Sequence, residues 1–302
     1  MATNIINTFT TPNRPLTWLI TGCSSGLGLA LVRHIQRQDR GHRVIATSRN
    51  PSKTPELVDE VGRKGGRWLK LDVDDLDSST LIDDLESSQG YQIDVLVNNA
   101  GYSVHNAVEH FTEGEVRAMM DTLYFGPSRL MRAVLPHMRA RRFGVIVNIS
   151  SGAGLEGRES MGAYAAAKAA LDGVTKVLAK EVAPFNVRAI YVPLGALNTG
   201  FGSKIVVGKN YPMNDDYTGS AADHIMSSLG GGSYRMDGDP DKAANVVYEV
   251  IVGEGVGKGK EGERVLPLGR DLAVRVKQIV DQWNHTMEVF GHVCNNVYVD
   301  DN

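Results

Sequence analysis

Short apolar runs alternate with longer amphipathic stretches along the chain from Leu16 onward. The short runs have the length of buried strands, and the longer stretches place their apolar residues on one face of a helix. Strands that alternate with helices in this way are typical of a parallel sheet covered by helices on both faces. We expect strands at Thr17–Thr21, His42–Thr47, Arg67–Leu71, Ile93–Val97, Gly144–Ile149, Val187–Val192 and, as a short one, Arg264–Pro267.

The longest of the expected helices cover residues 112–139 and 162–182. With the strands they predict a single domain over residues 16–302: an α/β fold with a doubly wound, Rossmann-type parallel sheet of about seven strands. Residues 1–15 lack this periodicity and are predicted to form a flexible arm. Residues 198–235 are rich in Gly, Ser, Asp and Tyr, which is typical of a substrate lid, and a C-terminal helical extension is expected over residues 270–302.

The composition narrows the class of partner. A chain of 302 residues with 42% hydrophobic content can bury a substantial core. Its net charge of -3 gives no long-range attraction to nucleic acid or to anionic lipid, so we expect a small-molecule substrate and neither of those partners. Two cysteines, Cys23 and Cys294, cannot build a disulfide framework, which indicates a reducing compartment, and the cytoplasm is expected. The N-terminal residues show no basic region followed by an apolar stretch, and we expect no apolar run elsewhere to be long enough to cross a bilayer.

The eight histidines show neither an HExxH pair nor cysteine partners at metal-ligand spacing, so we predict no metal site. His105 is expected to be a surface histidine, with a place in the pocket as the alternative. The lid segment contains four large side chains that can pack either on an apolar substrate or on one another: Phe201, Tyr211, Met213 and Tyr217.

Tyr164 and Lys168 lie four residues apart in an alanine-rich helical stretch, downstream of Ser151. Residues at this spacing share one helix face, so the ammonium group is expected beside the phenol, where it lowers the pKa of Tyr164. The tyrosine then becomes a usable acid near neutral pH, and Ser151 can donate a second hydrogen bond to the same substrate oxygen. The three side chains together can protonate a carbonyl oxygen.

The segment Thr21–Gly28 carries three glycines between the first strand and the first helix. Glycines at this place let the backbone approach a pyrophosphate, whose charge the helix N-terminus favours. The same residues match the nucleophile elbow of hydrolases, with Ser24 between Gly22 and Gly26. A hydrolase would need a downstream histidine, and His224, His285 or His292 has the right order. We favour dinucleotide binding, because it also uses Asn98–Gly101 and the Tyr164 pair.

These motifs resemble the classical short-chain dehydrogenase/reductase family, over roughly residues 16 to 270. Its TGxxxGxG turn is met by Thr21, Gly22, Gly26 and Gly28, and its NNAG element by Asn98–Gly101. The chain is most similar to the 17β-hydroxysteroid dehydrogenase type branch, through the TGCSSG sequence at 21–26 and Leu266–Gly269. That branch includes reductases of many other ketones, so the resemblance implies no sterol substrate.

The resemblance implies catalytic roles for Ser151, Tyr164 and Lys168, and it places the adenine-side aspartate at Asp72, before Val73. It also implies dimers or tetramers built on helices such as the one that carries Tyr164, whose small residues include Ala165, Ala169 and Gly173. The full set of expected cofactor-binding residues comprises Thr21, Gly22, Ser24, Ser25, Gly26, Leu27, Gly28, Arg49, Asp72, Val73, Asn99, Gly101, Tyr164, Lys168, Gly195, Leu197 and Thr199.

The end of the second strand indicates which nicotinamide cofactor binds. Pockets for NAD usually place a carboxylate there, which bonds the ribose hydroxyls and repels a 2′-phosphate. This strand ends in Ala46–Arg49, and no acid follows before Glu56. Arg49, with Ser24 and Ser25, offers a cation and hydroxyl donors to the phosphate, so we expect NADPH/NADP⁺; the alternative is an ordinary surface arginine.

Two positions depart from the family pattern. The family's catalytic asparagine falls on Leu123, which retains only its main-chain carbonyl for the water that leads protons to the lysine. The Pro-Gly pair after the sixth strand reads Pro193-Leu194-Gly195.

We expect an NADPH-dependent oxidoreductase that reduces a ketone or aldehyde of a hydrophobic or secondary-metabolite substrate. A non-redox isomerase, dehydratase or cyclase on the same fold is the alternative, and a cofactor-sensing binding protein is disfavoured by the complete Ser151, Tyr164 and Lys168 set.

Overall fold

The computed structural model describes residues 9–199, 205–230, 236–294 and 296–297. The chain forms one α/β domain around a six-stranded parallel sheet in the order β3-β2-β1-β4-β6-β7. The strands of this sheet are β1 (Thr17–Ile20), β2 (Arg43–Ser48), β3 (Arg67–Lys70), β4 (Val95–Asn98), β6 (Gly144–Ser151) and β7 (Val187–Leu194). A separate parallel pair consists of β5 (Ser103–His105) and β8 (Ile205–Val207).

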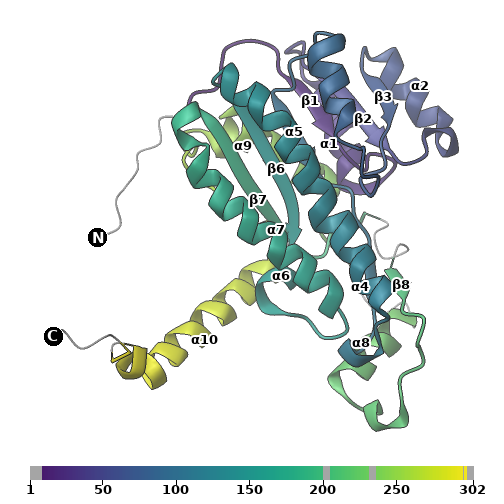
Figure 1. Ribbon diagram of the computed structural model, residues 1–302, viewed down its shortest axis with the longest axis vertical. Coiled ribbons are helices and arrows are strands. Elements are labelled where there is room, and N and C mark those ends of the chain that lie inside the picture. The colour runs from purple at the N-terminus through teal and green to yellow at the C-terminus, as the bar shows by residue number, and fades with distance from the viewer. Residues whose placement is uncertain (1–8, 200–204, 231–235, 295, 298–302) are drawn as a thin grey trace.

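The helices connect these strands and cover both faces of the sheet (Figure 1). They are α1 (Gly26–Arg37), α2 (Pro55–Arg63), α3 (Thr80–Asp83), α4 (Glu113–Met120), α5 (Gly126–Ala140), α6 (Ala153–Glu156), α7 (Gly162–Glu181), α8 (Ala221–Gly230), α9 (Pro240–Val252) and α10 (Arg270–Cys294). The first six predicted strands therefore appear in the predicted order, and so do the helices α1 and α7.

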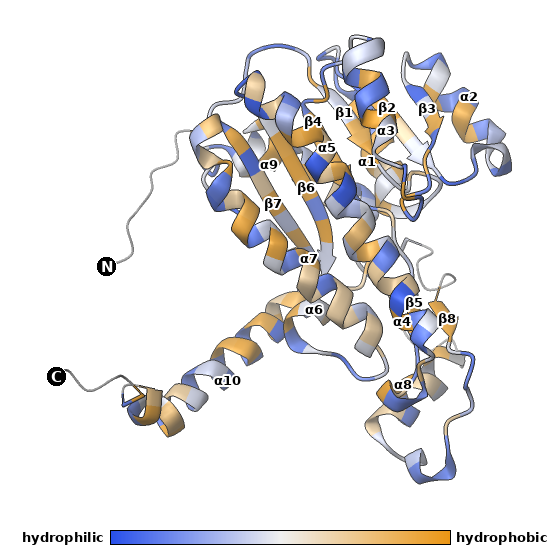
Figure 2. Ribbon diagram, viewed as in Figure 1, coloured by the Kyte–Doolittle hydropathy of each residue, from blue (hydrophilic) through white to orange (hydrophobic). Residues whose placement is uncertain are grey.

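Alternate side chains of each strand feed two apolar layers, because successive strand residues point to opposite faces. In β6, Val145, Val147 and Ile149 pack with α1 and α9, whereas Ile146 packs with α5 and α7. Figure 2 shows the resulting concentration of apolar residues on the central strands. Each fully buried aliphatic side chain stabilises the fold by roughly 1.5–3 kcal/mol relative to exposure. Because apolar layers pack on both faces of the sheet, the carboxyl ends of its strands are held in place at one edge.

The predicted short strand at Arg264–Pro267 is not a strand of the sheet. This segment contacts β7 only through isolated bridges, Tyr191 with Val265 and Leu194 with Leu268. Backbone hydrogen bonds form on either side of Pro193, which has no N–H to donate and so interrupts the ladder. The sheet consequently has six regular strands.

The long helical segment expected over residues 112–139 is also interrupted. A π-helical turn, Asp121–Phe125, separates α4 from α5. Pro127 follows at the start of α5 and cannot donate the α-helical hydrogen bond to the carbonyl of Leu123. Single π-turns of this kind are frequent at functional sites.

The expected N-terminal arm is attached to the body where the structure describes it. Phe9 is buried, with its ring centroid 5.8 Å from that of Phe143. Arg14 makes an ion pair with the fully buried Asp94 at 2.7 Å. At the other end, α10 projects away from the domain (Figure 1). Among the described residues, no helix is both long and apolar enough to cross a membrane.

Candidate active site

Tyr164, Lys168 and Ser151 meet at the carboxyl edge of the sheet. Ser151 is the last residue of β6, and Tyr164 and Lys168 lie one turn apart in the first half of α7, which packs on β6 and β7. Ser151 and Tyr164 are joined by a side-chain hydrogen bond. The Lys168 Nζ donates to the carbonyl oxygen of Ile149 at 2.7 Å and lies 5.8 Å from the centroid of the Tyr164 ring. The helix spacing predicted from sequence therefore places all three groups together.

The electrostatics of this cluster differ from the expectation for Tyr164. Burial raises the pKa of Tyr164 to about 12, an effect that the hydrogen bond from Ser151 opposes and the charge of Asp172 reinforces. Burial also lowers the pKa of Lys168 to about 8, and attraction to Asp172 opposes that change. The expected lowering of the phenol pKa by Lys168 was wrong for this structure, because desolvation dominates and the ammonium group is bound to the Ile149 carbonyl.

The glycine turn after β1 is held against the end of β4. Gly22 has a φ of +72°, and a Cβ atom there would lie 2.7 Å from the Cα of Ala100. The Thr21 hydroxyl accepts hydrogen bonds from the backbone N–H groups of Asn99 and Ala100, and the Asn99 side chain donates to the Thr21 carbonyl at 2.8 Å. Thr21 and Asn99 therefore fix the turn against the NNAG segment. Ser25, at the N-cap of α1, makes no capping hydrogen bond through its side chain.

A cavity of about 800 Å³ runs along this edge of the sheet. It contacts both the glycine turn and the Tyr164 cluster, so one elongated ligand can reach both. Thr21 and Gly28 lie behind its wall, and Gly28 instead allows the close approach of the Asn99 amide. The predicted site residues that line it are Gly22, Ser24, Ser25, Gly26, Leu27, Arg49, Asp72, Val73, Asn99, Gly101, Ser151, Tyr164, Lys168, Gly195, Leu197 and Thr199.

Arg49 is exposed and lines the cavity, as do the glycine-turn residues Ser24 and Ser25. Its charge acts on Asp74, whose pKa is raised mainly by burial. Asp74 also lines the cavity and was missed from the sequence, since an aspartate two residues after Asp72 carries no motif. The Asp72 carboxylate accepts a hydrogen bond from the Asp74 backbone N–H at 3.2 Å, which shapes the loop after β3.

The loop after β7 is fixed by a residue from the far end of the chain. Asp271, at the start of α10, accepts hydrogen bonds from the backbone N–H of Ala196, and Gly195 donates to the carbonyl of Leu268 at 2.7 Å. Arg275 contacts Asp271, pairs with Glu156 at 2.6 Å and lines the cavity. Sequence analysis missed Asp271 and Arg275, because an ordinary i, i+4 pair on a helix gives no sign of a distant loop.

His105 is a buried residue, so the expectation of a surface histidine was wrong. It is 4% exposed, and burial lowers its pKa to about 4. Its Nδ1 lies 3.1 Å from the Ser160 hydroxyl, and the pairing of β5 with β8 covers it. The side chain borders the part of the cavity beyond Tyr164.

Residues 198–235, which were expected to form a lid, contribute to the cavity wall. The residues that do so differ from the four large side chains named from the sequence. Tyr211, Met213 and Tyr217 do not border the cavity, and Tyr217 packs on His110 with ring centroids 5.2 Å apart. Phe201 lies outside the described residues. Among the described residues of 198–235, those that line the cavity are two polar residues, Thr199 and Ser228, and four apolar ones, Ile205, Val206, Ile225 and Leu229; Met236, just beyond this range, also lines it.

Comparison with known proteins identifies the family to which this chain belongs. Residues 17–209 match the family model of the short chain dehydrogenases, which is more than half of the chain. The chain belongs to the short-chain dehydrogenase family. As an oxidoreductase of this family it uses a nicotinamide cofactor.

Two curated relatives and one solved structure illustrate the similarity of this short-chain dehydrogenase to others. A 3-ketodihydrosphingosine reductase from Bacteroides thetaiotaomicron is 38% identical over 217 residues, which cover 72% of this chain and 75% of the relative. Retinol dehydrogenase 8 from Bos taurus is 37% identical over 243 residues, 78% of each chain. A short-chain dehydrogenase structure from Streptomyces avermitilis superposes with a TM-score of 0.82 at 31% identity, over 95% of this chain and all of the other.

The geometry fits a nicotinamide dinucleotide. Gly22 and Gly26, which both have positive φ angles, line the cavity, and the N-terminus of α1 begins there. A Cβ atom at Gly22 would collide with the Ala100 backbone, so the close packing that forms this cradle requires glycine. The Tyr164 cluster at the other end of the same cavity is where the reactive ring of such a ligand would lie.

Leu123 occupies the position of the family's asparagine in this short-chain dehydrogenase. It is almost completely buried in the π-helical turn and packs with Val104, Met119 and Tyr164. A Cβ atom on Gly101 would lie 2.8 Å from its Cδ2. An apolar side chain therefore fills the space, and only the main-chain carbonyl remains as a polar group at this position.

Proposed function

We propose that this short-chain dehydrogenase is an NADPH-dependent reductase that converts a ketone or aldehyde of a hydrophobic substrate to an alcohol. The observation that carries the proposal is the convergence of Ser151, Tyr164 and Lys168 in the cavity that also contains the glycine turn. Each side chain has the chemistry that carbonyl reduction needs at the oxygen. The proposal includes the catalytic roles of these three residues.

In the proposed reaction the cofactor supplies hydride to the carbonyl carbon. Tyr164 transfers its phenolic proton to the carbonyl oxygen, so that hydride and proton together give the alcohol. Ser151 hydrogen-bonds to Tyr164 and orients the substrate oxygen toward it. Burial opposes formation of the phenolate that remains. In the proposal the positive charge of Lys168, which is held in place by the Ile149 carbonyl, offsets part of that cost.

The preference for NADPH rests on Arg49. It lines the same cavity as Ser24 and Ser25, and the last residue of β2 before it is Ser48, not an acid. A guanidinium group at this place pairs with a 2′-phosphate, whereas a carboxylate would repel it. Asp74 also lines the cavity, and its carboxylate interacts with Arg49. Attraction between Arg49 and the phosphate therefore has to exceed the repulsion between Asp74 and the phosphate.

The substrate side of the cavity supports an apolar carbonyl compound. The cavity lining includes aliphatic side chains and methionines such as Met161, Ile205 and Leu229, and also the cations Arg158 and Arg275. His105 is uncharged near neutral pH, since its pKa is about 4, and adds no charge there. The names of the two relatives, a reductase of a ketodihydrosphingosine and a retinol dehydrogenase, are in line with an apolar substrate and with the 17β-hydroxysteroid dehydrogenase type branch.

A non-redox isomerase, dehydratase or cyclase is the second candidate, and Leu123 is the observation that favours it. Without an amide at this position, Leu123 offers only its main-chain carbonyl to a water that would carry a proton to Lys168. The Lys168 ammonium group itself donates to the Ile149 carbonyl. Enolisation or dehydration can use Tyr164 and Lys168 as acid and base without hydride transfer.

Other features of the proposal concern assembly and compartment. The outer face of α7 presents Ala166, Ala169, Gly173 and Val177 to solvent, and nothing lies within 4 Å of a Cβ atom built at Gly173. A second helix can approach closely there, which supports a homodimer or homotetramer.

Cys23 is buried and Cys294 is exposed, and both are free thiols, in line with a cytoplasmic protein.

The deciding experiment is the Tyr164→Phe variant, assayed by nicotinamide absorbance with a panel of ketones and aldehydes. We expect turnover to fall by about 10²–10⁴-fold while NADPH affinity stays unchanged. Tyr91→Phe is the matched control, because Tyr91 packs under Arg67 and does not border the cavity. Unchanged turnover in Tyr164→Phe would refute the mechanism. Conversion of a substrate without any absorbance change would establish the non-redox candidate.

A further inference from the structure

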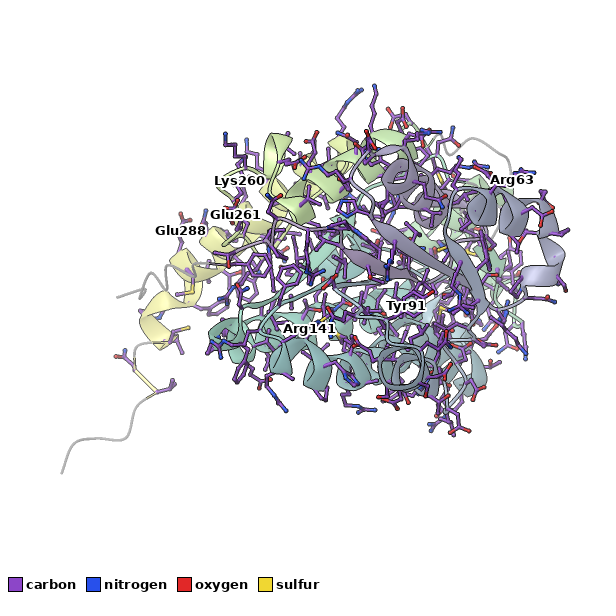
Figure 3. The ribbon with its side chains drawn as sticks, turned by 90° about the horizontal axis from the view of Figure 1, so that it is seen from above. Arg63, Tyr91, Arg141, Lys260, Glu261 and Glu288 are labelled. Atoms are coloured by element: carbon purple, nitrogen blue, oxygen red, sulfur yellow. The ribbon has the colours of Figure 1, made fainter. Side chains whose placement is uncertain are left out.

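The last helix, α10, is attached to the domain by its first turns alone. Leu272 is buried, and Arg275 pairs with Glu156 of α6. From Val280 to Cys294 nearly every side chain is exposed. This part of the helix extends about 20 Å from the domain, given a rise of about 1.5 Å per residue. In Figure 3, Glu288 marks the projecting part of α10, whereas Tyr91 and Arg141 lie on the domain.

The projecting helix carries large apolar side chains that the domain does not cover. Trp283 is 65% exposed and Phe290 is 56% exposed. Monomeric soluble proteins rarely leave such side chains grouped on one surface without a partner. Figure 2 shows apolar residues recurring along the length of α10. The exposed large apolar residues of this helix comprise Val274, Val280, Trp283, Met287, Val289, Phe290 and Val293.

One set of residues on α10 has the spacing of a coiled-coil seam. Steps of four and three residues alternate along the helix, so that one stripe continues over almost three heptads. Val274, Val289 and Val293 lie outside this stripe. The stripe, defined here as the arm seam, comprises Val276, Val280, Trp283, Met287, Phe290 and Cys294.

The charges of the arm exclude an anionic membrane as the covering surface. Helices that lie on membranes carry lysine and arginine on the polar side. Residues 278–294 contain neither, and the charged side chains there are Asp281 and Glu288. A negatively charged lipid surface would repel this helix.

We propose that α10 is a dimerisation arm whose seam packs against the α10 arm of a second copy of this chain. A copy of the same helix has a matching seam at the same spacing, and a two-fold axis lets each arm contact the other identically. Trp283 and Phe290 of two arms supply four rings, of which more than half is exposed. At roughly 200 Å² for each buried ring, these contribute on the order of 400 Å² toward the roughly 1,000 Å² of a stable interface.

The arm also has a link to the candidate active site. Its base contains Asp271, which holds the Ala196 backbone, and Arg275, which lines the cavity. Pairing of two arms fixes the direction of α10 and thereby the position of this base. The interface differs from the small-residue face of α7, which lies on another element.

The test is sedimentation velocity of the full chain, comparing the native protein with Trp283→Glu/Phe290→Glu. We expect the double variant to have half the mass of the native protein, whether that change is from dimer to monomer or from tetramer to dimer. The control is Gln278→Glu/His285→Glu, which introduces two glutamates at the same spacing on the opposite side of α10, and it should retain the native mass. Circular dichroism and NADPH binding verify that each variant is folded.

Three results would overturn the proposal: a monomeric native protein, an unchanged mass in Trp283→Glu/Phe290→Glu, or a halved mass in the control as well. A monomeric native protein that floats with phosphatidylserine-containing vesicles would identify a lipid partner instead. Should the double variant fail to fold, Met287→Asp serves as the second test, since Met287 lies in the middle of the exposed seam and touches none of the domain residues that anchor α10.

Discussion

Asp172 lies one helical turn beyond Lys168 on the buried side of α7, and its charge supports the protonated state of that lysine. Burial lowers the pKa of Lys168 to about 8, and attraction to Asp172 works against this change. Burial raises the pKa of Asp172 to about 6, while Ser150, Lys168 and Lys176 lower it. At neutral pH the acid is therefore mostly ionised and the lysine mostly protonated, a pair of opposite charges under the sheet edge.

The Asp172→Asn variant is expected to change the pH dependence of the proposed reaction. Protonated Lys168 is present below pH 8 and is lost as pH rises through its pKa. Without the carboxylate the pKa of Lys168 falls further, so the alkaline limb of the pH–rate profile should shift to lower pH by on the order of one unit. Glu181→Gln, at the exposed end of the same helix, is the control. An unshifted limb in Asp172→Asn would contradict the coupling.

Replacement of Arg49 by alanine is expected to remove the cofactor preference. Loss of a charge-assisted hydrogen bond to the 2′-phosphate costs about 1.5–3 kcal/mol, so NADPH should bind roughly 10–100-fold more weakly and NADH with unchanged affinity. Cofactor fluorescence titration measures both constants. Lys53→Ala removes a nearby cation that does not line the cavity and should change neither. Equal weakening of both cofactors would show that Arg49 acts on the fold and not on the phosphate.

The Asp271→Ala variant is expected to loosen the loop after β7. It removes the acceptor of the Ala196 N–H and one of the two acidic partners of Arg275, whose other partner is Glu156. We expect the KM for NADPH to rise about tenfold, in keeping with the 1.5–3 kcal/mol of a hydrogen bond to a charged group. Asp281→Ala, in the projecting part of the same helix, should behave like the native enzyme. A KM within twofold of native in Asp271→Ala would contradict the role assigned to the base of α10.

Replacement of Leu123 by asparagine tests whether the missing amide limits the reaction. Burying an amide among apolar neighbours is expected to cost about 1–3 kcal/mol of unfolding free energy, measured by denaturant titration. We expect kcat to change less than threefold, because the variant keeps the main-chain carbonyl at position 123, to which the family resemblance assigns the water that leads protons to the lysine. Leu130→Asn, buried in α5 away from the cavity, controls for the loss of stability. A tenfold gain in kcat would show that the side chain had been limiting.

Much of the fold was predictable because its signals are local. Strand-length apolar runs and the glycine turn predicted the succession of strands along the chain and a doubly wound parallel sheet, whereas the order of the strands within the sheet came from the structure. The i, i+4 spacing placed Tyr164 and Lys168 on one helix face. Local signals failed at Pro193, where a single missing N–H reduced an expected strand to isolated bridges, and at Pro127, where the expected long helix contains a π turn.

The sequence by itself determined the glycine turn, the placement of Tyr164 and Lys168 on one helix face, and the heptad spacing of α10, since each depends on residues close together along the chain. Tertiary structure alone decided the rest. It brought Asp271 and Arg275 from the last helix to the loop after β7, and it buried His105 under the β5–β8 pair. It also reversed the expected change in the pKa of Tyr164, because removal of water depends on everything packed around a side chain and not on its sequence neighbours.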